Sequence, residues 1–146
     1  YDYAHVCGKS EVYGRARVYG FADIRNKVQI FGDGSVHGHA VVSGRAMVYD
    51  SANIKSEARL YGHAQVFGNA IISGHAYVFG YAIVKGHSRV GDYAQVFGDA
   101  MVYGEAEISG DSIIYGTTEV CGASQISGMS VLAGDRIVCN EWIHMK

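Results

Sequence analysis

The chain has 146 residues, of which 49% are apolar, 20 are glycine and none is proline. This length and apolar content suit one domain with a buried core, and no apolar run approaches the ~18 residues that a membrane-spanning helix needs. Twelve basic and 14 acidic residues give a net charge of −2 and are spread along the chain, so no basic stripe exists for a nucleic acid backbone. We expect a soluble, cytoplasmic protein that binds neither nucleic acid nor a membrane.

A six-residue period begins with the first residues of the chain. An aliphatic residue occupies every sixth position from Val6 to Val138, 23 positions without an exception. Glycine stands two residues after most of them, and Ala, Ser or Thr stands four residues after. The pattern is most regular over residues 61–84, in units of the type V-F-G-x-A-x. A period this strict predicts a solenoid made of one repeated unit.

The pattern inside each unit indicates a short strand followed by a corner. Apolar residues alternate with others, so Ala16 and Val18 are expected to point inward while Arg17 and Tyr19 point outward. The glycine that follows permits a positive φ. Three corners would close a triangle of about 18 residues, and each strand would pair in parallel with the next coil at about 4.8 Å. We therefore predict an all-β fold, a triangular parallel β-helix of about seven to eight coils.

Units such as V-Y-G-R-A-R at residues 12–17 resemble the hexapeptide repeats of left-handed parallel β-helix proteins, over residues 4–138. The resemblance implies a left-handed coil, frequent trimers, and acyl transfer in the enzymes of the family. The chain departs from the commonest pattern because Tyr, Phe or Ser directly follows the aliphatic residue and Gly comes one place later. This variant is similar to V-Y-G-N-A repeats of bacterial and phage proteins labelled as transferases. A right-handed helix similar to that of bactofilins is the alternative, since periodicity alone does not set handedness.

Some segments depart from the regular pattern. The first coil starts in register without a cap, and its unpaired strands would meet a preceding segment or a partner. Residues 25–36 are interpreted as a local bulge, because three of their places carry unusual residues: Asn26, Val28 and Gly34. Residues 1–138 are expected to form the β-helix, and residues 139–146 a C-terminal cap in which Trp142 and Ile143 fold over the last coil.

Residues at the same place in successive coils lie on the same side of the triangular prism. We call the three sides faces one, two and three, and their residues differ. Faces one and two carry stacked aromatic residues, whereas face three is polar. Aromatic patches of this extent are typical of protein interfaces, although stacked rings also stabilise neighbouring coils by themselves. We predict an interface at Tyr61, Tyr77, Phe79, Phe97 and Tyr115 on face one and at Tyr13, Phe31, Tyr49, Phe67 and Tyr103 on face two.

Catalytic chemistry has weaker support. His39 and His75 share an edge with Glu57 between them, so these three residues are the candidates for a catalytic base. A solvent-exposed turn residue is the simpler interpretation of a corner histidine. A zinc site made by three histidines lacks any supporting spacing, and we predict neither a metal nor a cofactor. The three cysteines are interpreted as free thiols, with a disulfide between Cys121 and Cys139 as the alternative.

Our leading hypothesis is a non-enzymatic structural or interaction module. It would present flat aromatic faces for self-assembly, as a dimer or trimer, or for binding and inhibiting another protein. An uninterrupted prism without inserted loops favours recognition over turnover. The alternative is a hexapeptide-repeat acyltransferase with an acyl-donor site between subunits, near His39, Glu57 and His75 or near His63 and His87.

Overall fold

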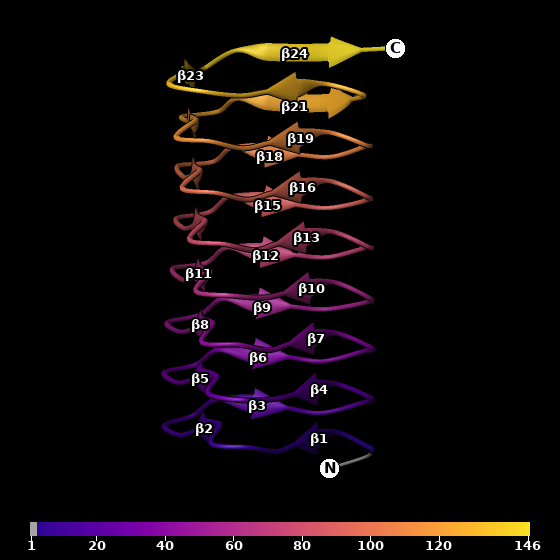
Figure 1. The fold of residues 1–146 in the computed structure, drawn as a ribbon, viewed down its shortest axis with the longest axis vertical. Helices are drawn as coiled ribbons and strands as arrows, with labels where there is room; N and C mark the ends of the chain where they lie inside the picture. Colours follow the sequence, from indigo (N-terminus) through magenta and orange to yellow (C-terminus); the bar gives the residue numbers. More distant parts are fainter. Residues whose placement is uncertain (1–2) are drawn as a thin grey trace.

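The computed structural model describes residues 3–146, so Tyr1 and Asp2, the first two residues of the predicted β-helix, lie outside this range. The described residues form a tall prism of stacked triangular coils, with the two termini at opposite ends (Figure 1). Three parallel sheets of eight strands each form its sides. The prediction of an all-β, triangular parallel β-helix of about eight coils is confirmed. Within residues 3–146 no helix is long and apolar enough to cross a membrane.

Each sheet collects every third strand of the chain, and its outer surface is one of the three faces. Face one is formed by β1 (His5–Val6), β4 (Asp23–Ile24), β7 (Val41–Val42), β10 (Arg59–Leu60), β13 (Tyr77–Val78), β16 (Gln95–Val96), β19 (Ile113–Ile114) and β22 (Val131–Leu132). Face two is formed by β2 (Glu11–Val12), β5 (Gln29–Ile30), β8 (Met47–Val48), β11 (Gln65–Val66), β14 (Ile83–Val84), β17 (Met101–Val102), β20 (Glu119–Cys121) and β23 (Ile137–Cys139). Face three is formed by β3 (Arg17–Val18), β6 (Ser35–Val36), β9 (Asn53–Ile54), β12 (Ile71–Ile72), β15 (Arg89–Val90), β18 (Glu107–Ile108), β21 (Gln125–Gly128) and β24 (Trp142–Met145).

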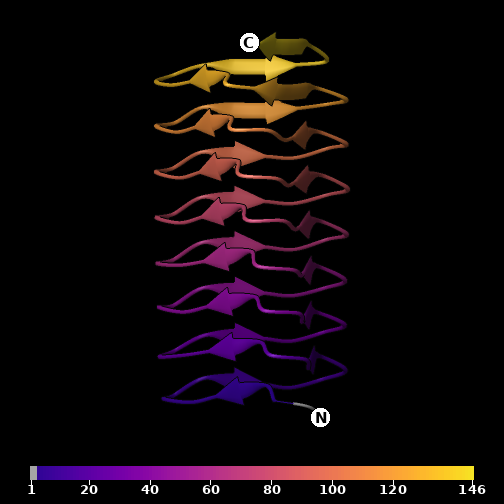
Figure 2. The ribbon, with the colours of Figure 1, turned by 90° about the vertical axis from the view of Figure 1, so that its right-hand side faces the viewer.

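Backbone hydrogen bonds between coils hold the prism together. Tyr77 in β13 lies beside Gln95 in β16, which occupies the same place in the next coil. The N–H of Tyr77 donates to the carbonyl oxygen of Ala94 at 2.9 Å, and the N–H of Phe79 donates to that of Val96 at 3.0 Å. The same bonds recur along the chain, and each coil lies directly over the one before it (Figure 2). Because the coils have the same length, side chains at the same place in successive coils form straight columns on every face.

The core consists of the two inward columns that the period predicts. All aliphatic residues of the six-residue series from Ile24 to Val138 are buried, with at most 3% exposure. The small-residue column lies beside them, and its hydroxyls are satisfied: Ser88 Oγ donates to the carbonyl oxygen of Lys85 at 2.8 Å. In the described part of the chain, every buried side-chain nitrogen and oxygen has a hydrogen-bond partner. Serine can thus replace alanine at these places without the cost of an unsatisfied polar group.

The corners explain both the glycines and their replacements. Gly80 has a φ of 73°, and a Cβ there would lie 3.0 Å from the nitrogen of Gly98 in the next coil. Asp92 occupies such a corner with a φ of 53°, and its carboxylate accepts a hydrogen bond from the N–H of Gly110 at 2.9 Å. Such departures from glycine have a local structural role.

The bulge predicted for residues 25–36 is absent. Gln29 in β5 pairs with Met47 in β8 at the regular offset, and Ser35 pairs with Asn53 in the same way. Val28 is fully buried in the column that elsewhere holds small residues, mostly alanine and serine. The core accepts the larger side chain without a break in the ladder, so this part of the prediction is wrong.

The C-terminal segment continues the prism by one more strand. Strand β24 pairs with β21, and Trp142 rather than Ile143 lies beside Gln125, so the last coil is shorter than the others. Because side chains alternate along a strand, Ile143 packs against the core while Trp142 points outward and is 80% exposed. Ile143 contacts the core as expected, but Trp142 does not fold over it.

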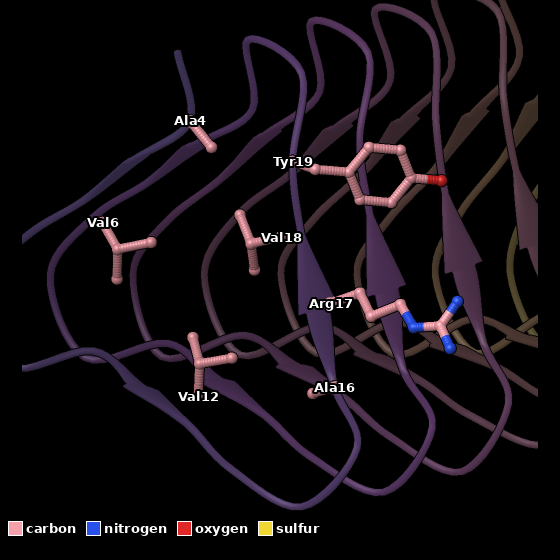
Figure 3. Close-up of a pocket in the computed structure, with 7 residues that line it drawn as sticks. All are labelled: Ala4, Val6, Val12, Ala16, Arg17, Val18 and Tyr19. Carbon is pink, nitrogen blue, oxygen red and sulfur yellow. The ribbon is translucent and has the colours of Figure 1, made fainter. Parts of the chain in front are cut away.

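The opposite end of the prism exposes core positions of the first coil. Val6 is 45% exposed and Val12 39% exposed. They line a hollow together with Ala4, Ala16, Arg17, Val18 and Tyr19 (Figure 3). The hollow is the open cross-section of the core.

Two adjacent isoleucines in β12 test the inward and outward assignment. Ile72 is fully buried, whereas Ile71 is half-buried on face three. We expect Ile72→Ala to lower the free energy of unfolding by about 2–5 kcal/mol, because it leaves a cavity in the core. The matched Ile71→Ala change should cost about 1 kcal/mol or less. Chemical denaturation measures both, and equal losses would contradict the assignment.

A pair of corner glycines separates backbone strain from steric clash. Gly80 and Gly134 have φ values of 73° and 79°, but a Cβ on Gly134 would meet nothing within 4 Å. We expect Gly134→Ala to cost about 1–2 kcal/mol, the strain of a left-handed residue. Gly80→Ala should cost clearly more, because its Cβ also presses on the next coil. Thermal and chemical denaturation provide the comparison, and a smaller loss for Gly80→Ala would refute the steric role.

Candidate functional site

Seven of the ten predicted aromatic residues form two ladders of stacked rings, one on each of two faces. On face two the rings of Tyr13, Phe31, Tyr49 and Phe67 follow one another with centroid separations of 5.1, 4.8 and 4.6 Å. On face one, Phe79, Phe97 and Tyr115 do the same at 4.6 and 5.2 Å. Neighbouring planes differ by at most 8°. The spacing equals the rise between coils, so the β-helix itself brings the rings into contact.

Stacking limits what the ladders can bind. Tyr49 has Phe31 against one side and Phe67 against the other, and Phe97 lies between Phe79 and Tyr115. An inner ring therefore has no free face on which a sugar or a nucleobase could stack. What stays accessible is a flat, half-buried strip of ring edges, a surface that suits another flat surface better than a small planar ligand.

The remaining predicted tyrosines use other contacts. Arg59 lies over the ring of Tyr77, and Lys85 lies over the ring of Tyr103, each 5.3 Å from the centroid. The Tyr103 hydroxyl donates to Glu119 at 2.9 Å, and this bond raises the pKa of the phenol. No ring-on-ring contact joins Tyr61 to the ladders within the described residues.

Burial within the face-two ladder also affects a phenol. Burial raises the pKa of Tyr49, and the neighbouring Asp50 carboxylate adds to the shift. The pKa shifts of Tyr49 and Tyr103 both favour the neutral phenol. Phenols are already neutral at physiological pH, and the raised pKa extends this neutral state of both tyrosines to higher pH.

The corner between faces three and one brings together two of the three catalytic candidates. Nδ1 of His75 lies 3.1 Å from Oε2 of Glu57, and both side chains are partly exposed. With the proton on Nδ1, the carboxylate orients the ring and leaves Nε2 free to accept a proton. His39, the third candidate, stacks on Phe21 with centroids 4.8 Å apart. The structure therefore supports a His75–Glu57 pair and leaves His39 outside it.

Stacking of histidines on aromatic rings was not anticipated. His75 stacks on Tyr93 and His63 on Tyr81, each with centroids 4.9 Å apart. His37 stacks on Tyr19 at 4.6 Å. The signal was present in the sequence, because the two members of each pair occupy the same place in adjacent coils. Most corner and face histidines thus extend the aromatic columns and have a structural explanation.

A second surface feature was also missed. A polar hollow lies on face three where Gly91 contributes no side chain. Lys55, Arg89, Glu107 and Ser73 lie around it. In residues 3–146 no group of three His, Cys, Asp or Glu side chains is arranged to hold a metal ion. The mixture of charges around the hollow selects no particular ligand.

The cysteines differ from the favoured prediction. Cys121 in β20 and Cys139 in β23 are paired neighbours on face two and form a disulfide, whereas Cys7 is free. Their Cα atoms are 4.5 Å apart, because the shared column places them on adjacent coils. The expectation of free thiols is therefore wrong for this pair, and the alternative from the sequence is correct.

Comparison with known proteins gives one short match. A family model described as the YdcK beta-solenoid repeat matches residues 94–110, about the length of one coil. No curated protein and no solved structure matches the chain. The match and the structure both indicate a β-solenoid. The similarity covers one repeat and does not extend over a whole protein.

Proposed function

We propose that the chain is a non-enzymatic structural or interaction module that presents flat aromatic faces to copies of itself or to another protein. The observation that carries the proposal is the pair of ladders on faces one and two. Their residues are half-buried or exposed within the chain, although the rings are stacked and apolar. Aromatic surface of this extent is enriched where proteins meet.

Rigidity adds support. All 24 strands of the described chain continue the same three sheets, and the ladders run without an inserted loop. A surface that needs little ordering on binding loses little conformational entropy. The prism therefore suits recognition by shape. Within this proposal the chain is a cytoplasmic, left-handed member of the hexapeptide-repeat class, and a bactofilin-like right-handed coil is the alternative.

Charged substitutions in the ladders test the proposal. We expect Phe67→Asp together with Phe79→Asp to abolish self-association or capture of a protein partner, because a desolvated carboxylate cannot be buried in a dry interface. Ser73→Asp on face three is the control and should leave assembly unchanged. Light scattering measures the mass, and immobilised chain followed by mass spectrometry identifies a bound partner. Equal behaviour of the double variant and the wild type would contradict the proposal.

Acyl transfer is the second candidate, favoured by the 3.1 Å contact between His75 and Glu57. In this proposal Nε2 of His75 would remove a proton from an acceptor hydroxyl or amine that attacks a thioester. Glu57 would hold the ring and stabilise its charged form. The donor would be a coenzyme A thioester bound in a cleft between subunits.

A matched histidine pair tests this second candidate. His75 and His63 both stack on a tyrosine at 4.9 Å, but only His75 contacts a carboxylate. We expect His75→Asn to reduce thiol release from acetyl coenzyme A at least about 100-fold, the range of a lost general base. His63→Asn should retain full activity. Absence of thiol release from the wild type with amine and hydroxyl acceptors would remove the candidate.

A further inference from the structure

Face one differs from the other two faces in its charge. From β7 to β22 its outward positions carry a single charged side chain, Arg59. The corresponding parts of the other faces carry Lys85 and Glu119 on face two and Lys55, Arg89 and Glu107 on face three. Burying a charge is costly unless it is paired. The part of face one from β7 to β22 therefore has the smallest penalty for burial, and the two charges of β4, Asp23 and Arg25, are paired with each other.

In one coil, rings also cover face one across its full width. In the coil that contains β13, outward positions follow one another as His75, Tyr77, Phe79 and Tyr81. The outer two residues stand at the corners, and Tyr81 is 62% exposed. Face two has rings in one column only, since its other column alternates Gln, Met, Ile and Glu. At this coil, a partner on face one would thus meet aromatic surface from edge to edge, and in the coils of β16 and β19 it would meet a ring beside Gln95 or Ile113.

A second copy of the chain has the same spacing between coils as this face, and it is therefore the partner that matches the face. The coils stack with little rotation, so the face is flat over its height (Figures 1 and 2). Two copies share the same rise per coil and can repeat one contact at every strand. Eight strands spaced about 4.8 Å apart and a face about five residues wide, at about 3.3 Å per residue, give roughly 600 Å² per copy. The total of roughly 1,200 Å² reaches the lower end of specific interfaces.

Face one has two outward columns: the residues directly before each buried aliphatic residue, such as Tyr77, and the residues directly after it, such as Phe79. A twofold axis parallel to the β-helix makes these columns complementary. It places each column of one copy against the other column of the second copy, at the same coil. Tyr77 then lies opposite Phe79 of the second copy, and Arg59 lies opposite Tyr61 of the second copy. Each coil from β13 to β19 sets one ladder ring against one residue of the column that contains Tyr77, so the two ladders do not meet each other. An antiparallel arrangement would place ladder against ladder.

Charge complementarity selects the same arrangement. Asp23 and Arg25 flank Ile24 in β4 and already form an ion pair, and the Arg25 hydrogen bond lowers the pKa of Asp23. With parallel copies, Asp23 faces Arg25 of the second copy and Arg25 faces Asp23 of the second copy. The four charges contributed by the two copies then alternate in sign around the contact. In an antiparallel pair, β4 would lie near β19, whose outward residues are neutral.

We infer that face one joins two copies of this chain in a parallel, in-register dimer around a twofold axis along the β-helix. This inference rests on the proposed interaction function and assigns its face, partner and orientation. The aromatic column and the largely uncharged column beside it supply the buried area, and Asp23 with Arg25 sets the register.

Phe79 and Phe67 provide a matched test of the face. Each is the end ring of a ladder, and each stacks on its one neighbour at 4.6 Å. Wild-type chain should show twice the 15.7 kDa mass of one copy by light scattering. Phe79→Asp should reduce the mass to that of one copy, and Phe67→Asp should retain the dimer. Circular dichroism confirms that both variants are folded to the same extent.

Charge variants test the orientation without touching the rings. Asp23→Arg and Arg25→Asp should each weaken dimerisation about tenfold or more, because like charges then face one another. An equimolar mixture should regain a heterodimer, measured by native mass spectrometry. Absence of this preference would overturn the parallel arrangement.

The outcomes separate the inference from the function on which it rests. A dimer broken by Phe67→Asp alone overturns the assignment to face one but keeps an aromatic interface on face two. A wild-type chain that is monomeric at all concentrations overturns the homodimer, and the function then rests on partner capture. A dimer that both phenylalanine variants leave intact overturns the inference and the aromatic interface together.

Discussion

The parallel hydrogen-bond ladder between coils is the constraint on which the structure depends. It requires each strand to lie beside its counterpart in the next coil, as Tyr77 lies beside Gln95. Every inward column then becomes part of a continuous core, and every outward column becomes a row at the coil spacing. Core burial, the aromatic ladders, the histidine stacks and the cysteine pair are consequences of this one register.

The ladder also explains the tolerance of the chain to local substitutions. Val28 occupies an alanine place and Asp92 a glycine place, yet strand pairing continues on both sides of each. The inward column has room for an additional aliphatic group at the first site. At the second, the carboxylate supplies a hydrogen bond to the next coil. Such positions look irregular in the sequence but not in the fold.

The outward surfaces connect this architecture to function. Stacked rings such as Phe79 and Phe97 stabilise adjacent coils, and the same stacking blocks the ring faces that a small ligand would use. Association through the remaining flat surface therefore agrees with the geometry. The His75–Glu57 pair is an arrangement with catalytic potential, and it arises because two corner residues lie on adjacent coils.

The sequence alone determined the six-residue period, the inward and outward columns and the three unequal faces, because in a solenoid each contact is set by a fixed offset along the chain. The same offset identified the ladder residues and offered Cys121 and Cys139 as neighbours. Only the tertiary structure decided that these thiols are joined, that Glu57 contacts His75 rather than His39, and that Trp142 points outward. These features depend on side-chain direction and on a shortened last corner, and neither is encoded in the period.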